Sequence, residues 1–278
     1  MDRGRSDGVQ LLSHDTHPAV EVEIDVAVLK TEIKKTYASV SDEPEKDFIF
    51  PTGRDWAEDL DYPPELATVP DRAVESFAGV ANPFSLGRLE RGERVLDLGS
   101  GAGTDSLVAA QMVGREGRVT GIDMTPAMLA KARGAAAEMG ATNVDFVEGE
   151  VEQLPCPDGS FDVVISNGVI DLIPDKDAVF SEIERVLVPG GRIQIADVTI
   201  QNPISAEGRR NIDLWTGSIA GALLEAAYAR LLERHGFERI ETGQLVDTYA
   251  RSKFEDTRRK AEKFGARGTT LKAYKPLP

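Results

Sequence analysis

The stretch Arg94-Val95-Leu96-Asp97-Leu98-Gly99-Ser100-Gly101-Ala102-Gly103 contains the strongest structural signal in the chain. Apolar residues run into an acidic residue, and three glycines then follow at every second position. This pattern predicts a buried strand, a tight glycine-rich turn and a helix that begins near Thr104. Glycine adopts positive φ freely and lets a ligand approach the backbone. Because the N–H groups at the head of the helix face such a ligand, the stretch predicts a ligand site at this turn.

The spacing of these glycines argues against a nicotinamide site. Gly99, Gly101 and Gly103 do not form the G-x-G-x-x-G pattern, because the third glycine comes too early. The next predicted strand, Arg118–Asp123, ends in an acidic residue twenty positions after Gly103. A carboxylate there can accept both hydroxyls of a ribose, although an ordinary strand–turn–helix with an unrelated Asp123 is the alternative. The D-L-G-S-G-A-G form followed by this acid resembles the cofactor site of class I S-adenosylmethionine (SAM) methyltransferases.

The composition limits the classes of protein to which the chain can belong. Its 278 residues are 41% apolar, which allows one large domain or two small ones with a sizeable core. The formal net charge of −15 disfavours a nucleic-acid partner, which usually requires a basic face. The sequence shows neither an apolar run that could span a membrane nor an apolar signal segment at its start. We therefore expect a cytoplasmic monomer or homodimer with no membrane or nucleic-acid partner.

Cysteine and histidine are too sparse in the sequence for a metal centre. The one cysteine, Cys156, excludes an intrachain disulfide and fits a reducing compartment. The three histidines, His14, His17 and His235, are scattered along the chain without other ligands nearby. We therefore expect no metal site.

Sequence pattern divides the chain into three parts. Residues 1–20 mix Gly, Ser, Asp and His without periodicity and predict a flexible tail. Residues 21–90 contain an apolar repeat at helical spacing and a stretch rich in proline and acidic residues, and we interpret them as a helical cap over the active site. Residues 91–278 form the predicted SAM-binding domain, in which 199–221 is an insertion on the acceptor side that serves as a lid.

Strands and helices alternate after the opening turn. The pattern predicts strands at 94–99, 118–123, 144–149, 161–167 and 192–198, helices at 104–113, 126–139, 176–187 and 222–235, and closing extended stretches at about 237–249 and 268–275 around a helix at about 252–264. This alternation indicates an α/β fold with a Rossmann-like, doubly wound, mostly parallel sheet and helices on both faces. The resemblance implies the seven-stranded class I methyltransferase type, with an antiparallel pair at one edge.

Polar and glycine residues stand at the ends of four predicted strands, where open α/β sheets bind ligands. Adenine needs an apolar slot and an acceptor for its amino group, which Met124, Val151 and Glu150 can provide. Asp123 suits the ribose, while the glycine-rich turn and Asn167 can contact the methionine amine and carboxylate. One acid at a strand end is usually only a solvated cap, but the four strand ends together favour SAM, with S-adenosylhomocysteine as product. The predicted cofactor-binding residues are Tyr37, Asp97, Gly99, Ser100, Gly101, Asp123, Met124, Gly149, Glu150, Val151 and Asn167.

Further motifs are similar to those of the arsenite methyltransferase group, which stands near the ubiquinone and menaquinone C-methyltransferases. The likeness covers roughly residues 25–276. Its motifs are Asp123–Met128, Val147–Glu150, Val164–Asn167, Pro174–Lys176, Leu187–Gly191, Asn82-Pro83, Trp215–Leu223 and Lys272–Pro276. Tyr37 resembles the tyrosine of the family's N-terminal helix that lies over the cofactor, and ordinary helix packing is its other interpretation.

The resemblance fails at the acceptor site. The arsenite enzymes hold trivalent arsenic with three cysteines, and this chain has Val80, Gly168 and Ser218 at the matching positions. Cys156 matches none of the three. Because a soft metalloid needs thiolate ligands, the resemblance implies a methyltransferase scaffold whose acceptor site has been rebuilt. Together with Trp215, the three substituted positions form the predicted acceptor pocket, which suits an apolar or aromatic small molecule.

The sequence offers several candidates for a catalytic base. Methyl transfer requires alignment of the nucleophile, and an oxygen, nitrogen or carbon nucleophile often requires deprotonation as well. Asp171 is the candidate base, because it stands where the arsenite group tends to have a neutral amide. A helix cap is the alternative interpretation of Asp171, and Asp197 and His235 are weaker candidates.

These observations predict a SAM-dependent methyltransferase that acts on oxygen, nitrogen or carbon of a small organic acceptor. A non-catalytic SAM- or S-adenosylhomocysteine-binding protein is the alternative, because no acceptor base is established. Arsenite methylation is less favoured because the three cysteines are missing.

Overall fold

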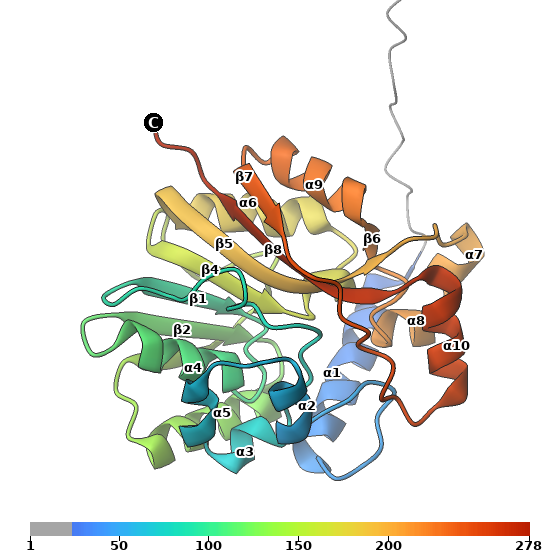
Figure 1. Ribbon diagram of the computed structural model, residues 1–278, viewed down its shortest axis with the longest axis horizontal. Coiled ribbons are helices and arrows are strands. Elements are labelled where there is room, and N and C mark those ends of the chain that lie inside the picture. Colours follow the sequence, from blue (N-terminus) through green and yellow to red (C-terminus); the bar gives the residue numbers. More distant parts are fainter. Residues whose placement is uncertain (1–23) are drawn as a thin grey trace, which may run out of the picture.

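A computed structural model describes residues 24–278, so the predicted tail at 1–20 lies outside the described residues, as do His14 and His17. In the described part of the chain, eight strands form one sheet (Figure 1). Seven of them lie in the order β3-β2-β1-β4-β5-β8-β7, and the short β6 pairs with β5. The strands are β1 (Arg94–Leu98), β2 (Arg118–Asp123), β3 (Val144–Glu148), β4 (Phe161–Asn167), β5 (Leu187–Ile200), β6 (Leu223–Leu224), β7 (Glu238–Thr242) and β8 (Arg267–Tyr274).

The strand order confirms the predicted doubly wound architecture. Strands β1 to β5 pair in parallel. The chain runs outward from β1 through β2 to β3 and then returns to β4 on the other side of β1. The connections that follow β1 and β4 therefore lead in opposite directions along the sheet. The carboxyl ends of these two strands form a switch point, where open α/β sheets bind their ligands.

Alternating side chains of the strands build one hydrophobic core on each face of the sheet. In β1, Val95 packs into the core that contains α4 and α5, whereas Leu96 and Leu98 pack into the core that contains α6 and α9. This follows from the two-residue period of a strand. Figure 1 shows the two helical layers on either side of the sheet. The four helices are α4 (Thr104–Val113), α5 (Pro126–Met139), α6 (Lys176–Val186) and α9 (Glu225–Arg234).

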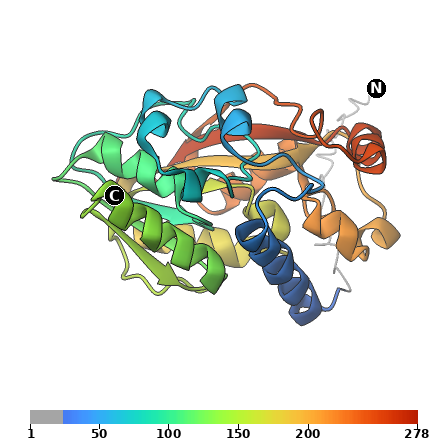
Figure 2. The same cartoon turned by 90° about the horizontal axis from the view of Figure 1, so that it is seen from below.

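Several short helices and one long helix surround the carboxyl ends of the strands. The long helix α1 (Val26–Asp42) begins at Asp25, whose side chain accepts hydrogen bonds from two backbone N–H groups of the first turn. It packs against α5 and α8, as Figure 2 shows. The other elements are α2 (Arg54–Asp59), η1 (Pro64–Thr68), α3 (Asp71–Val74), η2 (Ile170–Leu172), α7 (Ala206–Arg209), α8 (Ile212–Thr216) and α10 (Glu255–Phe264).

Two elements differ from the sequence prediction. Strand β5 begins at Leu187 and includes Pro189-Gly190-Gly191, which we predicted as a break between helix and strand. A register irregularity in the pairing with β4 accommodates this segment, and Lys275 exchanges backbone hydrogen bonds with both glycines. The eighth strand, β6, pairs with the end of β5 and takes two residues that we predicted as helix.

The last two long strands complete the sheet. Strand β8 lies antiparallel between β5 and β7, which confirms the predicted closing antiparallel pair. Strand β7 is shorter than the extended stretch predicted from sequence and has an irregular register.

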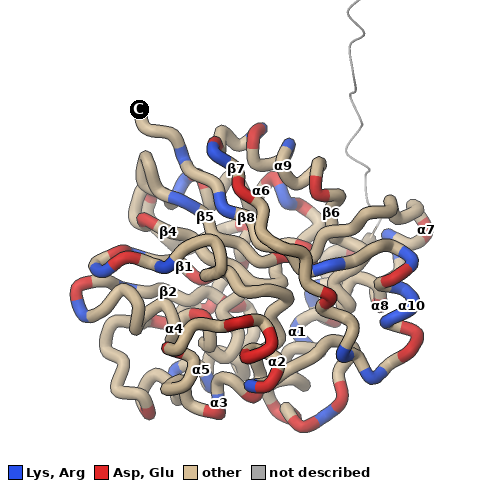
Figure 3. The backbone as a smooth tube through the Cα atoms, viewed as in Figure 1, with Lys and Arg blue, Asp and Glu red and all other residues tan. Residues whose placement is uncertain are grey.

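Acidic and basic residues are interspersed along the described part of the chain, as the backbone tube in Figure 3 shows. In α10, the basic residues Arg259 and Lys260 both pair with Asp256, at 2.6 and 2.7 Å. Within residues 24–278, none of the helices combines the length and the apolar character that a membrane crossing requires.

Candidate functional site

The glycine-rich turn between β1 and α4 is fixed against two neighbouring elements. The backbone N–H of Gly101 donates to Oδ2 of Asp123 at 2.9 Å, which ties the turn to the end of β2. On the other side, a Cβ atom at Gly99 would lie 2.3 Å from Cγ2 of Val169. Gly99 also has a φ of +66°, so only glycine fits both the backbone and the space. The turn is therefore held close to the residues that follow β4.

A first cavity, of about 70 Å³, lies beside this turn and is covered by α1. Two of its walls are apolar, since Ile33 comes from α1 and Leu172 from η2. The predicted cofactor residues that line it are Tyr37, Gly99, Asp123, Met124, Gly149, Glu150 and Val151. One cavity thus combines an apolar slot with an acidic side chain, which are the groups that adenine and ribose require.

Asp123 is held in a fixed orientation at the mouth of this cavity. Its Oδ1 accepts the Thr125 N–H at 2.7 Å, and its Oδ2 accepts the Gly101 N–H. Burial raises the pKa of Asp123, and these two backbone hydrogen bonds act in the opposite direction. A carboxylate has about four acceptor positions, so positions remain for the two hydroxyls of a ribose.

An ion-pair clamp, defined as Lys30 with Glu150 and Glu152, joins α1 to the loop after β3. The Lys30 Nζ lies 2.6 Å from Oε2 of Glu150 and 3.0 Å from Oε1 of Glu152. Burial acts to lower the pKa of Lys30, but the hydrogen bonds to both glutamates more than offset it and raise that pKa. Glu150, which we predicted as an acceptor for adenine, is thus bound to Lys30 in this structure. The sequence has no signal for this clamp, because its partners stand 120 residues apart.

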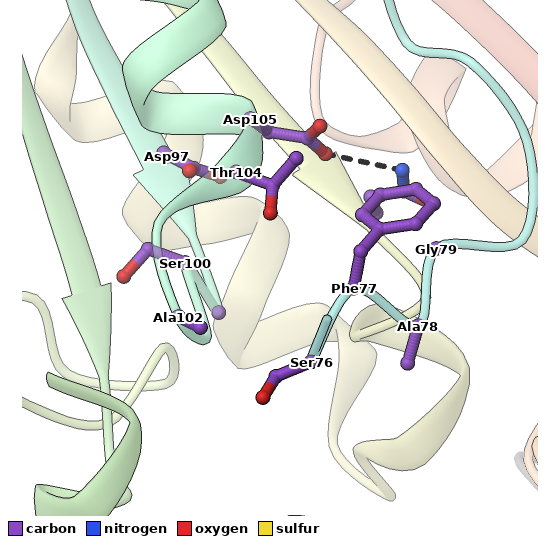
Figure 4. A pocket seen from close by; sticks show the side chains of 11 residues that line it. Ser76, Phe77, Ala78, Gly79, Asp97, Ser100, Ala102, Thr104 and Asp105 are labelled. Atoms are coloured by element: carbon purple, nitrogen blue, oxygen red, sulfur yellow. Dashed lines mark hydrogen bonds between the residues drawn. The ribbon is translucent and has the colours of Figure 1, made fainter. Parts of the chain in front are cut away.

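A second cavity, of about 60 Å³, lies on the other side of the turn (Figure 4). Ser100 and Thr104 line it from the turn and the head of α4, together with the segment 76–79. Both hydroxyl oxygens are buried and have no hydrogen-bond partner within residues 24–278. Buried polar groups are normally paired, so these two hydroxyls point to a polar ligand. Gly99 lines this cavity as well as the first.

Two neighbouring acids also line the second cavity. Asp97 accepts a hydrogen bond from the Ser106 hydroxyl at 2.5 Å, and burial together with the nearby Asp105 holds the pKa of Asp97 well above its usual range. Asp105 accepts the Tyr62 hydroxyl at 2.7 Å, and burial raises the pKa of Asp105 to about 6. A bound cation such as an amine would favour the ionised form of both acids.

The side chain of Asn167 lies at this cavity and binds the segment around Val80. Its Oδ1 accepts the Val80 N–H at 2.8 Å, while its Nδ2 donates to the Tyr62 hydroxyl at 2.8 Å and to the Ala81 carbonyl at 2.9 Å. Both ends of the amide are therefore used to hold the segment around Val80. Asn167 lines the second cavity, so its predicted contact with the methionine part of SAM stays a prediction, and its side chain also holds residues 62–81.

Four residues of the site were not predicted from the sequence: Thr104, Asp105, Tyr62 and Lys30. Thr104 and Asp105 follow the glycine-rich turn directly, and side chains in a first helical turn lie near a ligand at the helix N-terminus, so their position was a usable signal. Tyr62 and Lys30 lie in the N-terminal part of the chain, and only the tertiary fold brings them to the site.

The predicted acceptor residues form two pairs, Gly168 with Val80 and Ser218 with Trp215, whose carbonyl accepts the Ser218 N–H at 2.8 Å. A Cβ atom at Gly168 would lie 3.1 Å from Cγ1 of Val80, so these two positions meet. Ser218 lies beside Asp171 and acts to lower its pKa. Trp215 is buried in the same hydrophobic cluster as Val80, and its Nε1 donates to the Arg209 carbonyl at 2.7 Å. None of these four predicted acceptor residues is among the described residues that line the two cavities, so the acceptor pocket stays a prediction.

Metal-binding groups are not gathered anywhere in the described range. Over residues 24–278, no cluster of three or more His, Cys, Asp or Glu side chains is arranged to hold a metal ion. Cys156 is half-buried against the core on the α6 and α9 face, and burial raises the pKa of its thiol.

A doubly wound sheet with this turn, an acid at the end of the second strand and a helix over the cavity defines the class I methyltransferase architecture. The family model described as "Methyltransferase domain" matches residues 89–236. The chain therefore belongs to the methyltransferase domain family.

Similar proteins include arsenite and quinone methyltransferases. The arsenite methyltransferase of Halobacterium salinarum is 45% identical over 177 residues, which are 64% of this chain and 45% of that protein. The demethylmenaquinone methyltransferase of Listeria monocytogenes is 37% identical over 119 residues, 43% of this chain and 50% of that protein. The crystal structure of an arsenic(III) SAM methyltransferase from Chlamydomonas reinhardtii superimposes with a TM-score of 0.62 at 36% identity, over 78% of this chain and 75% of that one. The chain spans about half the length of these curated relatives.

Proposed function

We propose that this protein is a SAM-dependent methyltransferase that acts on a small organic acceptor. The observation that carries the proposal is that Gly99 lines two cavities of complementary chemistry. The first offers an apolar slot and Asp123, and the second offers two unpaired hydroxyls and two acids. SAM has an adenosine at one end and a charged amino acid at the other, so the cavities suit the two ends of one molecule.

Different residues bind the different parts of SAM. Asp123 holds the ribose, Met124 and Val151 enclose the adenine, and Ser100 and Thr104 donate to the carboxylate of the methionine part. When bound, SAM supplies an electrophilic methyl group on a positively charged sulfur. The protein then has to align an acceptor and exclude water, and such positioning accounts for much of the barrier reduction in reactions of this kind.

The acceptor is proposed to be organic rather than arsenite. Trivalent arsenic prefers thiolate ligands, and the chain has the single cysteine Cys156. This residue lies on the α6 and α9 face and is not among the lining residues described for the two cavities. The arsenite relatives thus support the scaffold and the methyl donor, and the missing cysteines support a different acceptor.

Transfer of label from methyl-labelled SAM tests this proposal. Parallel reactions would contain arsenite with a thiol, or a low-molecular-weight extract of the source cells. We expect label in an organic product and none in methylated arsenic. Label in arsenic would show that the three cysteines are dispensable. No label in either reaction, together with tight SAM binding, would favour a non-catalytic binding protein.

A further inference from the structure

The buried carboxyl of Asp171 is the most unusual polar group of the fold outside the two cavities. Asp171 is fully buried in η2, and neither of its carboxyl oxygens has a hydrogen-bond partner within the described chain. An unpaired buried acid costs several kcal/mol in general. Such a group therefore points to a ligand that is not part of the protein.

Asp171 lies between the first cavity and the insertion after β5. Leu172 and Ile173, the next two residues, line that cavity. On the opposite side, a Cβ atom at Gly221 would lie 1.8 Å from the Asp171 carbonyl oxygen, so the segment 212–221 is packed directly against η2. The carboxyl is thus next to the methyl-donor site and beneath the acceptor-side insertion.

A second acid and one lysine share this interior. The Asp171 N–H donates to Oδ1 of Asp197 at 3.2 Å, and the Tyr228 hydroxyl donates to its Oδ2 at 3.1 Å. Lys176 donates to the Ile173 carbonyl at 2.7 Å rather than to either acid, and burial lowers the pKa of Lys176 to about 8.

Ser218 and Asp197 are polar side chains close to the Asp171 carboxyl, and both act to lower its pKa. The hydroxyls of Tyr37 and Tyr249 are close enough for the charge of Asp171 to raise their pKa values, after the larger effect of burial. The Tyr249 hydroxyl donates to the Gly217 carbonyl at 2.8 Å. Arg209 lies near Lys176 and donates to the Ala220 carbonyl at 3.3 Å.

We propose that the Asp171 carboxyl binds and deprotonates the acceptor, and that the acceptor is a small primary or secondary amine. This inference rests on the proposed methyltransferase function. Both carboxyl oxygens are unpaired, and an ammonium group offers two or three N–H donors whereas a hydroxyl offers only one. A cationic group also compensates the charge of two acids that share one lysine.

The proposed methyl transfer needs no proton acceptor other than Asp171. Asp171 takes one proton from the ammonium and leaves a neutral amine with a free electron pair. The nitrogen forms a bond to the methyl carbon as the carbon–sulfur bond breaks, and the electron pair of that bond remains on sulfur in S-adenosylhomocysteine. The methylated product is an ammonium ion, and Asp171 carries the proton to solvent when the product leaves. Because Asp171 is fully covered, the segment 212–221 has to move for the acceptor to enter.

Asp171→Asn tests the inference, with Asp175→Asn as the matched control. The first variant keeps the shape and removes the base. The second changes an exposed acid four residues away that caps α6, and asparagine caps equally well. Benzylamine and benzyl alcohol serve as isosteric probes with methyl-labelled SAM, beside the extract of source cells. We expect label in benzylamine, or in cationic products of the extract, and a loss of at least about 100-fold in kcat/KM for Asp171→Asn alone.

Two further measurements separate this role from a structural one. Affinity for S-adenosylhomocysteine is expected to stay within about twofold in both variants. Asp171→Asn is expected to resist urea better than the wild type, because the variant removes a buried unpaired acid. Label in benzyl alcohol or in neutral products, full amine transfer by Asp171→Asn, weakened S-adenosylhomocysteine binding or a less stable variant would each overturn the inference. If the wild type labels no product at all, the proposed function itself fails.

Discussion

At the scale of single residues, Asp123 is the acid on which the proposed binding of SAM depends most. Its carboxylate is oriented by two backbone N–H groups and faces the first cavity. Asp123→Ala removes the charge-assisted hydrogen bonds to the ribose, which are worth about 1.5–3 kcal/mol. We expect SAM affinity, measured by calorimetry, to fall by about 10- to 100-fold. Asp145→Ala is the control, because it changes an acid near the start of β3 that pairs with Arg118 at the start of β2. Equal losses of SAM affinity in the two variants would contradict the assignment of Asp123 to the ribose.

Gly99 offers a test of the turn itself. Gly99 and Gly140 both have a φ of +66°, but a Cβ at Gly99 would meet Val169 at 2.3 Å, whereas a Cβ at Gly140 would meet no atom of the described residues within 4 Å. Gly140→Ala therefore measures backbone strain alone, about 1 kcal/mol. Gly99→Ala adds a steric collision, so we expect a further loss of about 1–3 kcal/mol in urea unfolding and a loss of SAM binding. Equal stability of the two variants would show that Val169 moves aside freely.

Site residues could be predicted from the sequence where the local chain alone fixes their position. Asp123 stands at the end of a strand with strong apolar signal, so its place at the sheet edge follows from β2 alone. Lys30 and Tyr62 reach the site only through the tertiary fold, and nothing near them in sequence indicates their partners. The contact of Asn167 with Val80 was missed for the same reason: the position was predicted, but the partner lies 87 residues away.

At the scale of elements, the ion-pair clamp ties α1, which covers the first cavity, to the loop after β3. Lys30 is partly exposed, and pairs of this kind contribute about 0.2–1 kcal/mol. Lys30→Gln is therefore expected to raise both the association and the dissociation rate constants for SAM by about two- to fivefold in stopped-flow measurements.

The matched control for this clamp is Lys35→Gln. Lys35 lies on the same helix and pairs only with Glu32, one turn earlier, among the described residues. Its rate constants should stay at the wild-type values. Unchanged rates in Lys30→Gln would mean that α1 does not limit the entry of SAM.

The boundaries of helices and strands were predicted well where the local residue pattern determines them. They were predicted poorly where hydrogen bonds to a distant segment of the chain extend a strand. Helices α4 and α5 occupy the predicted ranges, because a glycine-rich turn or Pro126 marks each start. Strand β5 runs through Pro189-Gly190-Gly191 because Lys275, which directly follows β8, supplies hydrogen-bond partners there. That partner comes from the far end of the chain, so the local sequence could only indicate a break.

At the scale of the whole molecule, the doubly wound order follows from sequence, whereas the distribution of buried charge does not. The alternation of strands and helices leaves few topologies, because parallel crossovers have one hand. Burial of Asp97, Asp105, Asp123, Asp171 and Asp197 raises the pKa of every one of them. These acids lie in β1, α4, β2, η2 and β5, and their burial depends on the tertiary fold rather than on the local sequence.

These buried acids should make stability depend on pH in a defined direction. Burial raises the pKa of Asp105 to about 6, from an ordinary value of 3.8, so between those values the folded state binds more protons than the unfolded state. Stability then falls as the pH rises through this window, by about 1.4 kcal/mol for each pKa unit, or roughly 3 kcal/mol for Asp105 over the whole window, of which about half falls between pH 5 and pH 7.5. Urea unfolding at pH 5 and pH 7.5 measures the change. We expect the wild type to be more stable at pH 5 than at pH 7.5, and we expect this difference in the free energy of unfolding to be smaller in Asp105→Asn. An equal pH dependence of stability in both proteins would show that Asp105 is ionised throughout.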